Sequence, residues 1–143
     1  MATLVYNHYK KLLLSGGIDL IQDPIYAMLL SGSYIPNSGH VTISDVSAHQ
    51  VTDSLGSYQP GGQLLTSKTI NVVNGIGIFD AADVSWSNAT ISNASGVVLW
   101  ASGASPSTRY LICWNELGNQ SPTNGTLQIQ WNNTNGIFRI GAL

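Results

Sequence analysis

Charged residues are scarce in this 143-residue chain: Asp, Glu, Lys and Arg make up 8% of it, where about 25% is usual. The net charge is −2, and the five basic residues are scattered along the chain. We therefore expect no nucleic-acid binding, which depends on clustered positive charge. A surface of neutral polar side chains stays hydrated but repels identical copies only weakly. This favours a protein that packs against copies of itself; the alternative is a neutral surface without a partner.

Cysteine and long apolar runs are also nearly absent. The single cysteine, Cys113, excludes an internal disulfide. It lies in the apolar run 110–114, which predicts a buried, inert thiol rather than a nucleophile. No window approaches the roughly 18 apolar residues that would span a membrane. The first residues do not resemble a signal peptide, so we expect folding in a cytoplasm.

Motifs that carry catalysis are missing as well. The sequence contains no phosphate-binding loop, dinucleotide fingerprint or nucleophile elbow. Seven acidic residues leave little material for paired-carboxylate chemistry. His40, Asp45 and His49 could converge on a metal ion, but their spacing fits no zinc pattern and solvated loop residues are the simpler interpretation. We therefore predict no enzyme activity, metal or cofactor.

What the chain does contain is enough apolar material, 43%, for the core of one domain. A helix is predicted over residues 3–15, with Thr3 as its cap and Gly16-Gly17 as its stop. We treat 1–17 as a helical segment that packs on the domain or on a neighbouring subunit. Residues 18–143 are expected to form the domain itself, with a long Gly- and Pro-containing loop at 31–62.

Beyond the helix the hydrophobic period changes to that of strands. Two hairpin signals, Asn74-Gly75 and Asn135-Gly136, fall between apolar segments. The pattern predicts an all-β fold, an antiparallel sandwich or jelly-roll-like barrel of about eight strands with one short N-terminal helix. The expected strands cover 25–30, 63–73, 76–79, 82–87, 96–101, 110–114, 126–131 and 137–140. The four tryptophans lie at core-phase positions or in apolar runs, which favours packing over sugar stacking.

Several segments resemble a family of small virion structural proteins of tailed bacteriophages. The likeness covers nearly the whole chain, from the short opening helix to the end. The block Phe79-Asp80-Ala81-Ala82-Asp83-Val84 with Trp86 is its most specific part. Other parts are Tyr58-Gln59-Pro60-Gly61-Gly62 followed by Leu65 and Thr69, then Asn124-Gly125-Thr126 with Ile129 and Trp131, and Gly136-Ile137-Phe138. The chain departs from the family at 115–119, where relatives often carry more acid, and at Trp100.

The resemblance implies a component of the virion. We expect a capsid decoration (cement) protein that binds the outside of the shell, with the major capsid protein and itself, as a homotrimer, for partners. The alternative is a head-fibre or tail-fibre module that binds a host receptor or carbohydrate. Deleting residues 1–15 is then expected to release the protein from particles and leave the β-domain folded. The candidate assembly contacts are Leu4, Val5, Tyr9, Leu12, Tyr34, Ile35 and Tyr58.

Overall fold

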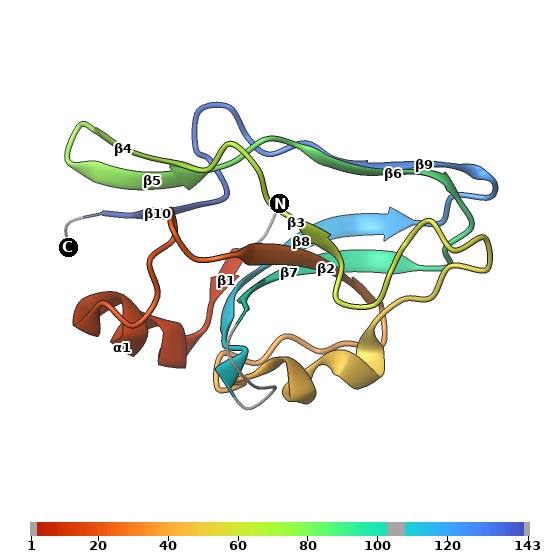
Figure 1. Cartoon of the computed structure of the whole chain (residues 1–143), viewed down its shortest axis with the longest axis horizontal. Helices are drawn as coiled ribbons and strands as arrows, with labels where there is room; N and C mark the ends of the chain where they lie inside the picture. The colour runs from red at the N-terminus through yellow and green to blue at the C-terminus, as the bar shows by residue number, and fades with distance from the viewer. Residues whose placement is uncertain (1–2, 103–107, 142–143) are drawn as a thin grey trace.

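The computed structural model describes residues 3–102 and 108–141. It is mostly β, with 46% strand and 12% helix, as the sequence pattern predicts. Figure 1 shows two β layers, one above the other, with α1 and the segment 43–49 below. The elements are β1 (Thr3–Val5), α1 (Asn7–Ser15), β2 (Ile25–Ser31), η1 (Ile43–Asp45), η2 (Ser47–His49), β3 (Gln63–Leu64), β4 (Thr69–Val73), β5 (Ile76–Asp80), β6 (Val84–Ala89), β7 (Ala94–Ala101), β8 (Leu111–Gln120), β9 (Gly125–Ile129) and β10 (Phe138–Ile140).

One layer is a five-stranded antiparallel sheet with the order β1-β8-β7-β2-β3. The other combines the three-stranded sheet β10-β5-β4 with the two-stranded ladder β6-β9. The main core fills the space between the layers, where alternate residues of β2 and β7 meet Phe79, Trp86 and Ile129. The fold is therefore sandwich-like, with both layers contributing to one core.

A second core lies on the outer face of the five-stranded sheet. Met28, Val98 and Leu111 point to this side and are covered by Tyr34 and Val46 of the 31–62 segment. Since both faces of β2 and β7 are buried, these strands are apolar without alternation. The long loop thus acts as a third layer, which explains why the central strands read as continuous apolar runs.

The predicted helix over 3–15 is wrong at its start. Thr3–Val5 is a strand, and it pairs with β8 so that Val5 lies opposite Cys113. The helix begins at Asn7 after Tyr6, an extended N-cap without a side-chain cap, and Gly16 ends it with a left-handed φ of 71°. Pairing with a sheet edge satisfies the backbone groups of Thr3–Val5, so tertiary contacts outweigh the helical spacing of their side chains.

The expected strand over 63–73 is two strands in different sheets. Leu65 is buried, Ser67 adopts a positive φ of 53°, and the Lys68 amine donates a hydrogen bond to the Asp23 carbonyl. This turn moves the chain from β3 in the five-stranded sheet to β4 in the opposite one. Together with β1, the division gives ten strands among the described residues, in place of about eight.

Candidate functional site

The 31–62 segment was expected to present aromatic anchors to a partner, but two of them lie inside the fold. Tyr34 is buried in the second core, and its hydroxyl lies 2.9 Å from that of Tyr6 and 3.0 Å from Nδ1 of His40. Burial raises the pKa of Tyr34, and burial with the hydrogen bond to Tyr34 raises that of Tyr6. Both phenols therefore stay protonated and join the N-terminal segment to the loop layer.

Tyr58 has a similar role on the inner side of the sheet. The Leu29 N–H donates to the Tyr58 hydroxyl at 3.0 Å, and that hydroxyl donates to Oε1 of Gln50 at 2.9 Å. Oε1 of Gln50 also accepts the Gly61 N–H at 2.6 Å. Burial raises the pKa of Tyr58, so it remains a neutral hydrogen-bond donor. These bonds fix the loop layer against β2.

The structure shows where the seven expected assembly contacts lie. Tyr9, Tyr34 and Tyr58 are buried within the domain. Three further contacts are half-buried; they are Leu4, Val5 and Leu12. Only Ile35 is freely accessible, at 81% exposed. Aromatic and aliphatic residue types suggested anchors for a partner, but most of these side chains pack in the protein's own two cores.

The three residues considered as metal ligands are each engaged in local structure. His40 bonds to Tyr34, and His49 Nδ1 lies 2.9 Å from the Ser33 hydroxyl. Asp45 accepts the backbone N–H groups of Val41 and Thr42, and these bonds hold the pKa of its carboxyl below the usual value. Among the described residues, no three His, Cys, Asp or Glu side chains form a group that could hold a metal ion.

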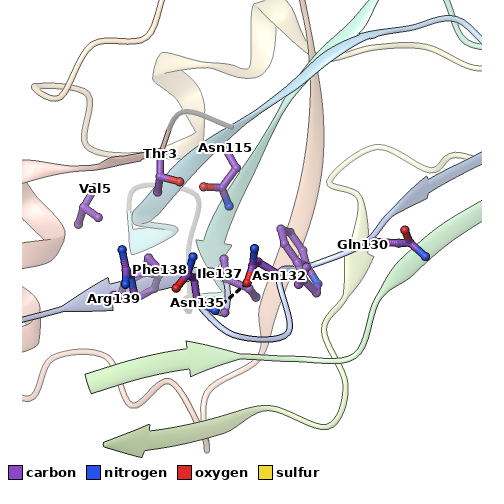
Figure 2. A pocket seen from close by; sticks show the side chains of 11 residues that line it. Thr3, Val5, Asn115, Gln130, Asn132, Asn135, Ile137, Phe138 and Arg139 are labelled. Carbon is purple, nitrogen blue, oxygen red and sulfur yellow. Dashed lines mark hydrogen bonds between the residues drawn. The ribbon is translucent and has the colours of Figure 1, made fainter. Parts of the chain in front are cut away.

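A surface hollow of about 530 Å³ opens on the side of the sandwich where β1 and β10 are edge strands. Figure 2 shows Thr3 and Asn115 on one side, with the turn at Asn132 and Asn135 and the side chain of Arg139 opposite. The Asn132 Oδ1 accepts the Asn135 N–H at 2.7 Å and stabilises this turn. The walls are thus mainly amides and the ends of strands.

Asn115 is the most unusual group in this hollow. It is 1% exposed, in the middle of β8, and no described residue bonds its side-chain Oδ1. Among the described residues that line the hollow, Arg139 is the only charged one, and none carries a carboxylate, imidazole or thiol. The described residues of the hollow therefore offer hydrogen-bonding groups and one positive charge. No sequence pattern predicts this hollow, because pairing between distant strands brings its walls together.

A second hollow, of about 420 Å³, lies between the five-stranded sheet and the loop layer. Tyr26 stacks on Trp100 with 4.8 Å between ring centroids, and Trp100 Nε1 donates to the Gly61 carbonyl at 2.9 Å. The Arg109 guanidinium lies 5.9 Å from the Trp100 ring centre. Trp100 itself is buried, as are Trp86 and Trp131, so packing is the main role of these rings, as predicted.

Cys113 is buried in the main core, as its sequence context predicts. Burial raises the pKa of its thiol. We expect native protein to react with a thiol reagent only at the rate of unfolding, and Cys113→Ala to lower the free energy of unfolding by about 1 kcal/mol through one lost buried group. Stopped-flow labelling with and without denaturant measures the first effect. Labelling of native protein at the rate of an exposed thiol would contradict it.

Comparison with family models, curated proteins and solved structures finds no match to this chain. Within residues 3–102 and 108–141, no helix is long and apolar enough to cross a membrane. Functional inference therefore depends on the surface and its chemistry.

Proposed function

We propose that this protein is a non-enzymatic structural component of a bacteriophage particle, a decoration protein that binds the outside of the capsid and stabilises the shell. The observation that carries the proposal is a nearly uncharged docking layer, the 31–62 segment, with two exposed apolar side chains. Ile35 projects from the 31–62 segment at 81% exposure, directly after the buried and hydrogen-bonded Tyr34. The family resemblance of the sequence points to the same kind of protein.

The rigidity of this layer favours docking. Tyr34 bonds the segment to Tyr6 of the N-terminal segment, and Tyr58 bonds it to β2, so binding needs little ordering of the loop. A second exposed apolar side chain, Leu55, lies in the same segment. With few charges to desolvate, a modest contact by each copy adds up over the many equivalent sites of a shell.

We expect Ile35→Asp to weaken binding to empty shells at least ten-fold, because the change places a charge in an apolar contact. Folding should be unaffected, since the side chain is largely in solvent. Gln128→Asp is the matched control: it adds the same charge on an exposed position of β9 and should bind like the wild type. Cosedimentation with shells that lack the protein measures both.

Two results would contradict this proposal. Full-length protein that stays in the supernatant does not decorate shells. Equal binding by Ile35→Asp and wild type would show that the protein does not bind shells through the docking layer, even if another surface of the protein binds them.

The second hollow supports one alternative, a fibre module that recognises host carbohydrate. Its half-buried Tyr26 ring, the Arg109 guanidinium and the Gln50 side chain offer an aromatic face and polar groups, the usual combination at sugar sites. Ser47 is exposed at its wall, so Ser47→Trp fills the space without removing a buried group. Binding to a host glycan array that Ser47→Trp abolishes, with no binding to shells, would replace the decoration proposal by this alternative.

A further inference from the structure

Strand β4 contributes almost nothing to the protein's own core. All five of its residues are exposed, and it is the edge of the order β10-β5-β4. In Figure 1 the hairpin of β4 and β5 projects at one end of the upper layer. Within the described part of the chain, its outer edge pairs with no strand. A free edge of this kind is a template for pairing with another chain.

The hairpin turn determines which backbone groups face outward. Asn74 and Gly75 have φ values of 51° and 77°, a two-residue turn between the paired residues Val73 and Ile76. Such a turn makes Val73 and Ile76 a hydrogen-bonded pair. Since hydrogen-bonded and non-bonded pairs alternate in an antiparallel ladder, Ile70 and Val72 direct their N–H and C=O groups to the free edge.

The side chains of the same two residues extend beyond the main core. Ile70 lies opposite Phe79, which in turn lies opposite the buried Phe138. The next row on this face is Val72, Gly77 and Ile140. Three side chains of these rows, Ile70, Val72 and Ile140, are 51%, 73% and 46% exposed, and we call them the β4 overhang. The β4 overhang continues the core-facing side of its sheet beyond the part of the sandwich that the opposite layer covers.

This edge lacks the usual protection against pairing. Natural edge strands carry charges, prolines or bulges that prevent association. Thr69–Val73 has no charge and no proline, and its register with β5 is regular. Lys68, the charged residue next to β4 in the sequence, donates a hydrogen bond to the Asp23 carbonyl, and Asp80 lies opposite Thr69 on the inner side, in β5. A permanently exposed strand of this composition is an aggregation hazard unless something covers it.

We propose that β4 pairs antiparallel with β4 of a second copy, about a two-fold axis at Asn71. In this register Ile70 of each copy lies opposite Val72 of the other, so the outward-facing backbone groups form four hydrogen bonds. The two overhangs then meet on one face and cover one another. The two sheets become one six-stranded sheet with the order β10-β5-β4-β4-β5-β10.

A second copy is the occupant because the strand is complementary to itself. The register places apolar beside apolar and Asn71 beside Asn71, and no like charges oppose each other. A five-residue strand is about 17 Å long, so the contact is smaller than the roughly 800 Å² per partner of a standard interface. Pairing is therefore weak in dilute solution and grows with local concentration. Pairing through β4 gives two-fold dimers, unlike the expected homotrimer. This proposal does not rest on the proposed function, because Ile35 is not part of the β4 contact.

Disulfide trapping tests the register. Asn71→Cys places two thiols at a non-hydrogen-bonded pair with Cα atoms about 4.5 Å apart, within the range of a disulfide. Val73→Cys is the matched control, because it is exposed on the same strand and face but lies about 14 Å from its own copy in this register. Cys113 is buried and does not compete. Each variant is incubated at high concentration in a glutathione redox buffer.

We expect Asn71→Cys to form covalent dimers at least ten-fold faster than Val73→Cys. Adding Val72→Lys, which buries a charge beside Ile70 of the other copy, should reduce that rate to the control level. Sedimentation of the wild type should show a concentration-dependent dimer that Val72→Lys lacks. Equal rates for the two cysteine variants, a rate insensitive to Val72→Lys, or a strictly monomeric wild type at high concentration would overturn the proposal.

Discussion

Gly62→Ala is expected to lower the free energy of unfolding by at least about 3 kcal/mol, a loss reserved for severe backbone conflicts. Gly62 has a φ of 87°, and a Cβ there would overlap the carbonyl of Ala27 and crowd the Cα of Met28. Both belong to β2, which lies between β7 and β3 in the five-stranded sheet, so neither can move without breaking the pairing of β2 with β7. The glycine allows the loop layer to approach the sheet at the point where it becomes β3.

Gly56→Ala is the matched control for this prediction. Gly56 has a similar φ of 79°, and a Cβ there meets nothing within 4 Å. It should therefore lose only the 1–2 kcal/mol of a left-handed alanine. Urea unfolding followed by circular dichroism measures both variants. An equal loss in Gly56→Ala and Gly62→Ala would show that the close approach of Gly62 to β2 does not matter.

Deletion of residues 1–15 is expected to abolish cooperative folding. The sequence pattern had predicted a separable helix, but β1 pairs with β8, and Tyr6 and Tyr9 are 0% exposed. Tyr9 packs edge-on against Phe138, with 5.9 Å between ring centroids. Loss of a large buried aromatic ring costs about 3–5 kcal/mol, so losing both approaches the 5–15 kcal/mol total of a typical domain.

Differential scanning calorimetry of the truncated chain tests this expectation. Leu14→Ser is the control, because Leu14 lies in the deleted segment but is exposed; it should melt like the wild type. A truncated protein that keeps the wild-type transition would mean that the N-terminal segment is an independent arm. In that case, release of the truncated protein from particles would indicate a lost contact with the shell. If the truncated chain does not fold, its release says nothing about contacts.

The features that could be predicted from sequence are those set by neighbouring residues. Asn74-Gly75 forms the expected hairpin because both residues adopt the positive φ that its turn needs. Cys113 is buried because residues 111–114 of its run belong to β8, which lies between β1 and β7. Strand β2 matches its apolar run, with one added residue at Ser31. In each case a local pattern is enough.

The features that could not be predicted depend on distant partners. The turn at Asn135-Gly136 exists, but β10 pairs with β5 rather than with β9, because Gly136 leads the chain to Phe79. Tyr34 and Tyr58 resemble contact residues until the loop layer is seen to cover the sheet. The hollow lined by Asn115 and the β4 overhang both arise from pairing between distant strands. The spacing of residues along the chain does not predict such pairing.

The central claim, that the protein decorates a capsid, is tested most directly by its copy number in purified phage particles. Quantitative mass spectrometry against the major capsid protein gives this number. Because a decoration protein occupies the equivalent sites of the shell, we predict hundreds of copies per particle, and their loss should lower the temperature at which the shell opens. A dozen copies or fewer would place the protein on a tail or fibre and contradict the claim.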